Sequence, residues 1–382
     1  MKLVLSDNGL HKRFAPLTLT RPVGDLRIGI LTNTERWRLL ANTEVYYETE
    51  TYLQGKFAIS EYCDITINAA LIPSREIGEV ILSLPDNSVL KYESTELARK
   101  GNGINQVNWM GEQPVIISQR WHLYQFNEIA LKQDFKLLTN NRISQPLSAT
   151  NTVIGDPSQI FLEKGAVVEA SILNTKSGPI YVGKDAEIME GCSVRGGLAL
   201  GEHAALKMGA KVYGAVTLGP HCKVGGEVSN VVFQAYSNKG HDGFLGNALI
   251  GEWCNLGADT NTSNLKNNYG NVSTYSYEAE AEVKTDVQFM GVCMGDHSKC
   301  GINTMFNTAT VVGVSCNVFG AEFPNKFVPS FSWGGQNPVS FKFDKAVEYA
   351  NNMMSRRGLV LTKEEIEILR KIHSDKIQDF ID

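Results

Sequence analysis

Aliphatic residues recur at every sixth position through the middle of the chain, and this spacing constrains the fold more than any other feature. The period of 3.6 residues of a helix and the period of two residues of a strand both fail to give this interval. Glycine often follows the recurring aliphatic residue directly, and a small side chain usually stands four positions after that aliphatic residue. The members form two runs: Val182, Ile188, Val194, Leu200, Leu206, Val212, Leu218 and Val224, then Met294, Cys300, Phe306, Val312 and Val318.

This spacing is the hexapeptide repeat of a parallel β-helix, in which each short strand stacks on the strand one coil earlier. We therefore predict a β-helix over residues 153–328. The repeat also accounts for several of the seven cysteines, because Cys192, Cys222 and Cys316 stand at small-residue positions and Cys300 at an aliphatic one. Their number is odd and no CxxC pair occurs, so we expect packing roles rather than disulfides or a zinc site.

The rest of the chain divides around this repeat. Residues 1–120 alternate short apolar runs (3–5, 28–31, 80–82, 115–117) with helical stretches such as Glu35–Thr51, which predicts an α/β domain. Residues 121–152 read as a connector helix over Trp121–Leu138 and a polar linker. Residues 329–382 form a helical tail, with helices expected over Asp344–Arg357 and Leu361–Ile381. We expect the tail to cap the open end of the β-helix or to pack on a neighbouring subunit.

Composition excludes several classes of protein. The 382 residues are 43% hydrophobic and 20% charged, with a formal net charge of −5. This balance argues against a nucleic-acid partner or a membrane surface. The apolar start of the chain is too short for a signal-peptide core, and no run approaches the roughly 18 apolar residues of a membrane span. The expected location is cytoplasmic.

The repeat is interrupted at residues 229–244 and 258–272. The second interruption is rich in asparagine and should protrude as a loop, either a solvated turn or a source of hydrogen bonds to a sugar, a phosphate or a pantetheine amide. The first contains His241 between Gly240 and Gly243. A positioned imidazole can accept a proton from an amine that attacks an acyl carbonyl, so His241 is the predicted catalytic base.

The segment KGHDGFLGNALIGEWCNLGADTNTSN resembles the acetyltransferase core of the bifunctional N-acetylglucosamine-1-phosphate uridyltransferase/glucosamine-1-phosphate acetyltransferase family. The K-x-G-H element falls on Lys239 and His241, and the asparagine series runs from Asn255 to Asn264. The resemblance implies a left-handed β-helix, a homotrimer and acetyl-CoA as co-substrate, with His241 as the general base. It also implies residues that bind the sugar phosphate (Asn255, Lys207, Lys239, Phe244, Lys266) and acetyl-CoA (Asn264, Gly291, Thr304). Phe244 replaces the family's tyrosine and Asp259 one of its glycines.

Near the N-terminus, Arg13–Thr18 with Arg21-Pro22 resembles the R-L-x-P-L-T-x-x-x-P segment of sugar-1-phosphate nucleotidyltransferases. The family's glycine-rich phosphate loop corresponds to Ser6–Lys12, which has one glycine, and Val23 replaces an expected lysine. The resemblance implies Lys12, Arg13 and Arg21 as nucleotide-binding residues and Mg²⁺ for the nucleotidyl step. Asp7 and Asp25 are the nearest carboxylates, and the metal ligands stay unknown.

Together these features predict a two-site enzyme. It would N-acetylate glucosamine-1-phosphate with acetyl-CoA and couple this step to nucleotidyl transfer that gives UDP-N-acetylglucosamine. One alternative is a nucleotidyltransferase for another sugar-1-phosphate, such as glucose-1-phosphate with dTTP or UTP, with a regulatory β-helix. A second alternative is a non-catalytic trimeric scaffold. The acceptor sugar and the nucleotide base stay open.

Overall fold

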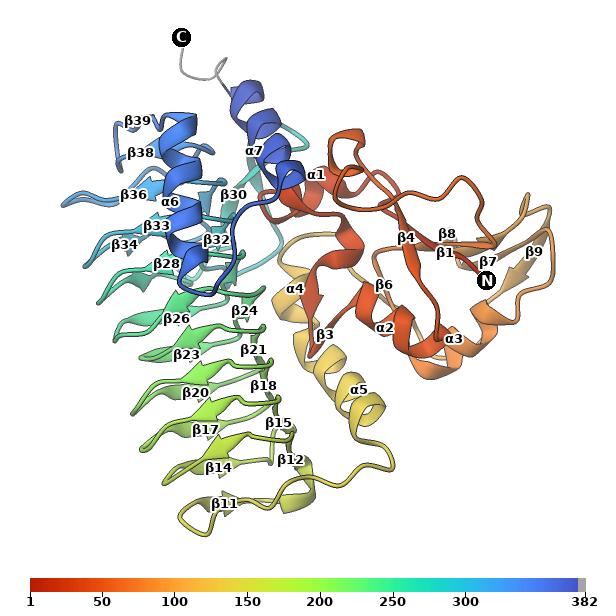
Figure 1. Cartoon of the computed structure of the whole chain (residues 1–382), viewed down its shortest axis with the longest axis horizontal. Helices are drawn as coiled ribbons and strands as arrows, with labels where there is room; N and C mark the ends of the chain where they lie inside the picture. The colour runs from red at the N-terminus through yellow and green to blue at the C-terminus, as the bar shows by residue number, and fades with distance from the viewer. Residues whose placement is uncertain (377–382) are drawn as a thin grey trace.

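The structure is a computed structural model that describes residues 1–376. An N-terminal α/β domain lies beside a long β-helix, and two C-terminal helices stand near the last coils (Figure 1). The predicted fold class, an α/β domain followed by a hexapeptide β-helix and a helical tail, is confirmed. The tail helices are α6 (Phe343–Ser355) and α7 (Lys363–Lys376), and the part of the expected second helix beyond residue 376 lies outside the described residues.

The N-terminal domain is built on a mixed six-stranded sheet. The strand order is β4 (Val45–Glu48), β1 (Leu3–Ser6), β5 (Ile65–Asn68), β8 (Thr95–Lys100), β7 (Ser88–Tyr92) and β9 (Asn105–Asn108). Strand β1 pairs in parallel with both β4 and β5, so the carboxyl ends of these three strands share one edge. Two short antiparallel pairs complete the domain: β2 (Arg27–Ile28) with β3 (Leu31–Thr32), and β6 (Leu71–Ile72) with β10 (Val115–Ile116).

The helices correct two sequence predictions. They are α1 (His11–Phe14), α2 (Asn33–Ala41), α3 (Arg75–Leu82), α4 (His122–Gln125) and α5 (Asn127–Thr139), with 3-10 turns η1 (Leu17–Thr20), η2 (Val23–Asp25), η3 (Thr51–Leu53) and η4 (Pro157–Gln159). The apolar run 80–82 lies in α3, where Ser74 caps the N-terminus, rather than in a strand. The helix expected over 35–51 ends at Ala41, because Asn42 adopts a left-handed conformation and β4 follows.

The β-helix has three parallel sheets that run along its length (Figure 1). The first holds β11 (Thr152–Ile154), β14 (Ile172–Asn174), β17 (Ser193–Arg195), β20 (Lys211–Tyr213), β23 (Glu227–Ser229) and β26 (Phe244–Gly246), followed by the pair β29 (Asn261–Thr262) and β34 (Met305–Phe306). The second holds β12 (Ile160–Leu162), β15 (Ile180–Val182), β18 (Leu198–Leu200), β21 (Val216–Leu218), β24 (Val232–Phe233), β27 (Leu249–Ile250), β32 (Cys293–Met294), β35 (Val311–Val312) and β37 (Phe327–Val328). The third holds β13 (Val167–Val168), β16 (Glu187–Ile188), β19 (Ala205–Leu206), β22 (Lys223–Val224), β25 (Asn238–Lys239), β28 (Asn255–Leu256), β33 (Lys299–Cys300), β36 (Asn317–Val318) and β38 (Ser332–Trp333), with β39 (Val339–Ser340) antiparallel at its end.

The six-residue spacing corresponds to the inward-facing positions of these sheets. Every member of both aliphatic runs belongs to one buried cluster inside the β-helix. Cys192, Cys222 and Cys316 lie in the same cluster, and none of the seven cysteines forms a disulfide. Burial of this apolar column in every coil is the main source of stability of the domain.

The interruption predicted at 229–244 is a shortened coil rather than a break. Leu206, Val224 and Lys239 are successive partners in the third sheet, and the coil from Val224 to Lys239 has 15 residues where the preceding coil has 18. The true insertion lies between β29 and β32. It contains the antiparallel hairpin of β30 (Ser273–Ser276) and β31 (Ala281–Lys284).

The three parts of the chain are held together by contacts from the connector, the hairpin and the tail. Asn127 in α5 donates to the carbonyl of Ala215 in the β-helix. Arg120 donates to Thr274 of the hairpin at 2.7 Å. Lys56 of the N-terminal domain pairs with Glu365 of α7 at 2.8 Å. Helix α7 therefore packs within this chain, between its own two large domains (Figure 1). None of the described helices has the length and apolar character that would let it cross a membrane.

The inward column gives a stability prediction. Leu206→Ala should lower the free energy of unfolding by about 2–5 kcal/mol, because the truncated side chain leaves a cavity in a fully buried site. The matched control is Lys211→Ala in the exposed outer row of the first sheet, where a change within about 0.5 kcal/mol is expected. Chemical denaturation followed by circular dichroism measures both values. Equal losses in the two variants would contradict the assignment of the core.

Candidate functional site

Four glycines stack where the third sheet turns into the first. Gly225, Gly240, Gly257 and Gly301 each follow an inward-facing residue of the third sheet in successive coils. A Cβ on Gly257 would lie 2.5 Å from the carbonyl carbon of Gly301, whereas a Cβ on Gly240 would meet no atom within 4 Å. We call this set the glycine column. It leaves a corner of the β-helix without side chains, where a ligand can approach the backbone.

His241 follows Gly240 directly and its side chain is exposed. Met208 and Ile302 occupy the equivalent position in other coils, two residues after their inward-facing residue, and each is 71% exposed. The predicted base therefore stands on an open corner, next to the glycine column and in a row with exposed apolar side chains. Figure 1 shows the coils of this region at β26 and β28, in the green part of the chain.

Lys239 was predicted to bind the sugar phosphate at the surface, but its side chain points into the β-helix. Its side chain is 1% exposed, and its ammonium donates to the carbonyls of Gly225, His241 and Asp242. Burial lowers the pKa of Lys239 to about 8, against the opposing effect of Asp242 and Asp259. With its donors occupied, Lys239 cannot contact a ligand on the surface, so this part of the prediction is corrected.

A second group gathers at the end of β26. The side-chain amide of Asn264 donates to Asn247 Oδ1 at 2.8 Å, and the backbone N–H of Gly291 donates to the Asn247 carbonyl at 2.9 Å. A Cβ on Gly246 would lie 2.6 Å from the ring of Phe244 and 2.7 Å from Asn264. The structure thus brings together Asn264, Gly291 and Phe244, three of the residues predicted to bind acetyl-CoA or the sugar phosphate.

The remaining predicted residues are spread around this corner. Asn255 is half-buried in β28, two residues before Gly257, and Lys207 stands below Gly225 at the foot of the glycine column. Lys266 lies in the inserted loop, where its ammonium donates to the carbonyl of Asn271 at 3.0 Å. Thr304 is buried inside the coil and its hydroxyl donates to the Gly301 carbonyl at 2.8 Å. Thr304 is therefore a core residue and does not reach a surface ligand.

The N-terminal domain has a pocket of about 600 Å³ at the carboxyl ends of β1, β4 and β5. The turn after β1 opens into it with positive φ angles at Asn8 and Gly9. Its lining residues are Ser6, Asp7, Asn8, Gly9, His11, Glu48, Thr49, Glu50, Thr51, Thr66, Glu96 and Arg99. Asp7 is buried and already accepts hydrogen bonds from Val23 and Thr49, whereas Glu48 and Glu50 are exposed. The pocket is therefore rich in carboxylates.

The three cations predicted to bind the nucleotide face the β-helix instead of this pocket. Lys12 pairs with Glu280 at 3.8 Å, and Arg13 pairs with Glu278 at 3.1 Å, both on the inserted hairpin. These pairs are exposed and weak, since solvent screens them. Asp25, considered as a metal ligand, lies in η2 and does not line the pocket. The sequence could not reveal these contacts, because the partners are more than 250 residues away.

Arg21 is the most strongly held of these cations. It donates to Glu252 at 2.7 Å and also to Asp296, which accepts a further bond from Thr20 at 2.7 Å. Burial would lower the pKa of Arg21, but Asp296 and Glu252 raise it above its ordinary value. Burial would likewise raise the pKa of Glu252, yet the attraction of Arg21 lowers it to about 2. The predicted nucleotide-binding role of Arg21 is corrected to an interdomain one.

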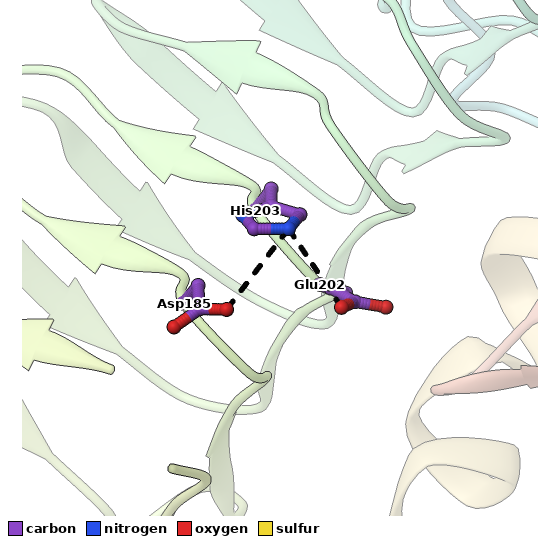
Figure 2. A group of neighbouring side chains, drawn as sticks. All are labelled: Asp185, Glu202 and His203. Carbon is purple, nitrogen blue, oxygen red and sulfur yellow. Dashed lines mark ion pairs between the residues drawn. The ribbon is translucent and has the colours of Figure 1, made fainter. Parts of the chain in front are cut away.

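One group of side chains in residues 1–376 has the spacing of metal ligands. Figure 2 shows Asp185, Glu202 and His203 on neighbouring coils of the β-helix. The imidazole Nε2 lies 4.0 Å from Asp185 and 3.7 Å from Glu202. All three side chains are exposed, and the ammonium of Lys184 already pairs with Glu202 at 2.8 Å. The group is a surface ion-pair cluster.

Comparison with known protein families found a match that covers the N-terminal domain. Residues 3–143 match the family described as sugar nucleotidyl transferase, a little over a third of the chain. The bifunctional protein GlmU of Methanocaldococcus jannaschii is 36% identical over 76 residues, which are 20% of this chain and 18% of that protein. The chain thus matches less than a fifth of the length of that curated relative. The N-terminal domain is therefore similar to sugar nucleotidyl transferases, so the proteins that this chain resembles are transferases.

Solved structures resemble this chain only distantly. The polySia specific acetyltransferase NeuO is 11% identical with a TM-score of 0.29, and covers 55% of this chain and 98% of its own. The Arabidopsis UDP-N-acetylglucosamine acyltransferase is 13% identical with a TM-score of 0.25, at 61% and 91% coverage. The polysialic acid O-acetyltransferase OatWY is 11% identical with a TM-score of 0.25, at 51% and 86% coverage.

Sequence reasoning missed the inward position of Lys239 and the acidic lining of the N-terminal pocket. The shortened coil hid the first, because it moves Lys239 out of the six-residue register. The alternation of strands and helices could have located the pocket edge at the ends of β1 and β4. Sequence alone could not show that Glu48 and Glu50 would face the same cavity.

The interdomain ion pair gives a second prediction. Arg21→Met should cost about 3–5 kcal/mol of unfolding free energy, because it leaves the buried Asp296 carboxylate and the partly buried Glu252 carboxylate without their positive counter-charge. Combining it with Glu252→Gln and Asp296→Asn should recover most of that loss. Arg13→Met, which removes an exposed pair, should cost about 0–1 kcal/mol. Urea denaturation measures all three, and an equal effect of the two single variants would refute the buried network.

Proposed function

We propose that the protein transfers the acetyl group of acetyl-CoA to the amine of an amino-sugar phosphate, glucosamine-1-phosphate, at the corner that carries His241. We further propose that the N-terminal domain attaches a nucleotide to the product, giving UDP-N-acetylglucosamine. The observation that carries the proposal is the exposed His241 beside a column of four glycines. The group of Asn264, Asn247 and Gly291, at the other end of β26, supports it.

The acetyl step follows from the chemistry of these groups. The sugar amine attacks the thioester carbonyl, and the imidazole of His241 accepts the proton that the amine loses. The carbon–sulfur bond then breaks, and the thiolate of coenzyme A takes up a proton as it leaves. A backbone N–H of the facing coil would stabilise the tetrahedral oxyanion. The bare glycine column gives an extended pantetheine chain close access to the backbone.

The residues around His241 suggest how the two substrates would bind. Asn255 and Lys207 flank the glycine column and would bind the sugar and its phosphate. Asn264 and Gly291 would lie along acetyl-CoA, and Phe244 would pack on the ligand, since it has no hydroxyl to offer a phosphate. Lys266 stands in the loop nearby and could supply a further cation by releasing the Asn271 carbonyl.

We also propose that the acetyl site is completed in a homotrimer. Met208 and Ile302 expose apolar surface in the same row as His241, and a second β-helix packed there would exclude water from the site. Size-exclusion chromatography with light scattering measures the subunit number. A monomer at micromolar concentration would contradict this part of the proposal.

The nucleotidyl step is assigned to the acidic pocket. Its lining fits Mg²⁺ held by one or two carboxylates together with substrate phosphates, and Glu48 and Glu50 are the exposed carboxylates there. When bound, the ion would neutralise phosphate charge. The backbone of Asn8 and Gly9 would approach the phosphates. Lys12 and Arg13 could turn towards them, because their pairs with the hairpin are exposed.

A second candidate function is nucleotidyl transfer alone, with the β-helix as a regulatory domain. The ion pairs of Arg21 with Glu252 and Asp296 favour this candidate, because they join the segment that resembles nucleotidyltransferases to the coils near His241. A test that separates the candidates is mass spectrometry of products after incubation with acetyl-CoA, UTP, Mg²⁺ and glucosamine-1-phosphate. Nucleotidylated but never acetylated sugar would favour the second candidate.

His241→Asn should lower the rate of acetyl transfer to glucosamine-1-phosphate by about 10²–10⁴-fold, because it removes the proton acceptor. The variant should keep its fold, since the side chain is exposed. The thiol released from acetyl-CoA is measured with a colorimetric reagent. His203→Asn, at an exposed corner outside the site, is the matched control and should leave the rate unchanged. A His241→Asn rate near that of the native protein would remove the assignment.

Glu48→Gln combined with Glu50→Gln should lower pyrophosphate release from UTP at least about 10-fold, because the pocket loses the charges that would hold the metal. Acetyl transfer should be unaffected, since the pocket lies in the other domain. Glu112→Gln, an exposed carboxylate of the same domain outside the pocket, is the control. Unchanged pyrophosphate release would place the metal elsewhere.

A further inference from the structure

Lys239 is an anomaly within the β-helix core. The inward-facing column of the third sheet is otherwise apolar around it, with Leu206 and Val224 below and Leu256 and Cys300 above. Packing alone would be met by another aliphatic side chain. Burying an ammonium ion is costly unless its donors are all satisfied. The reason for a lysine at this position therefore lies in the groups that its ammonium binds.

The ammonium ties together two adjacent pieces of backbone. It donates to the Gly225 carbonyl at 3.3 Å, to the His241 carbonyl at 2.8 Å and to the Asp242 carbonyl at 3.1 Å. An ammonium has three N–H donors, so each carbonyl receives one. Two of the three acceptors belong to the bend that carries His241, and the third belongs to the coil below it.

We propose that Lys239 is a positioning residue that fixes the bend 240–243 and thereby holds His241 where it can accept the proton of the substrate amine. This inference rests on the proposed function and adds a residue to it. The bend needs such a fixture. Gly240 and Gly243 flank its two polar residues, a Cβ on Gly240 would meet nothing within 4 Å, and His241 itself is exposed. Without the ammonium, the Gly225 and His241 carbonyls would lose their donor, and the Asp242 carbonyl would keep only the backbone N–H of Asp259.

The charge state of Lys239 supplies a test in the native protein. The ionisable groups that face it are Asp242 in the bend, Asp259 in the next coil and Cys300 in β33, and burial outweighs them to lower the pKa of Lys239 to about 8. Below that pH the ammonium has three hydrogens for three carbonyls. Above it the neutral amine has two, so the bend should loosen as the pH rises through about 8 while the chain stays folded. The pKa of Lys239 is higher in the unfolded chain than in the folded chain. Between these two pKa values, a rise in pH therefore stabilises the folded chain.

The experiment compares the native protein with Lys239→Met and Lys239→Arg, and uses Leu256→Met in the next coil as the matched core control. Amide hydrogen exchange of residues 240–243 and the NMR signals of the His241 ring report the bend without any substrate. We expect Lys239→Met to lose exchange protection there, Lys239→Arg to keep part of it, and Leu256→Met to keep all of it. In acetyl transfer, kcat of Lys239→Met should fall about 10–10²-fold with little change in KM, because a displaced base slows the chemical step.

Two further measurements test the role of Lys239: the pH profile of activity and amide exchange in the native protein. The activity of the native protein should decline above about pH 8, and this limb should be absent from the Lys239→Met profile. If Lys239→Met fails to fold, exchange at 240–243 in the native protein between pH 7 and 9, corrected for the intrinsic rate, decides the matter. Unchanged protection and ring signals would overturn the inference whatever the activity. A native protein that never acetylates glucosamine-1-phosphate would refute the proposed function, and the exchange data would still judge the bend.

Discussion

Backbone hydrogen bonding between successive coils is the constraint on which the rest of this structure depends. Each strand of the β-helix is only two or three residues long and pairs with the same strand one coil earlier, so no coil is stable alone. The inward side chains must therefore be of similar size from coil to coil, and the corners must stack closely. Glycine at the corners follows from this, as the contacts between Gly257 and Gly301 show. The repeat in the sequence is the direct consequence.

The residues that we propose for the acetyl step are concentrated where this repeat changes. The coil that ends at Lys239 is three residues shorter than its neighbour, and the coil after it precedes the hairpin insertion. A regular coil places an aliphatic side chain inward and a solvated turn outward, which leaves no polar group fixed at the surface. The shortened coil instead places an ammonium inside and an imidazole outside, two residues apart. Proximity of the two follows from the corner geometry rather than from any separate active-site loop.

The sequence was sufficient for the β-helix and insufficient for the contacts between domains, and the role predicted for His241 stays a prediction. Periodicity reports side chains that repeat along one element, so it located the inward column and the small residues beside it. It contains no information on which charges meet across 230 to 280 positions, as Arg21 does with Glu252 and Asp296. A motif match assigns Arg13 and Arg21 to phosphate, but the partner that competes for them comes from the hairpin or the coil. Lys239 was predicted to bind the sugar phosphate but lies inside the β-helix, because the shortened coil shifts the register by three residues.

The placement of Arg21 links the two halves of the molecule in one physical argument. Arg21 follows η1, and Val23 two residues later donates its N–H to Asp7, which lines the N-terminal pocket. Arg21 itself is fixed by Asp296, whose other oxygen accepts the N–H of Glu252 in the coil that continues to Asn255. A buried guanidinium between two carboxylates has one low-energy geometry, because any displacement leaves a charge unpaired. The turn beside the pocket and the coil that continues to Asn255 are therefore joined through buried, charged hydrogen bonds of Arg21.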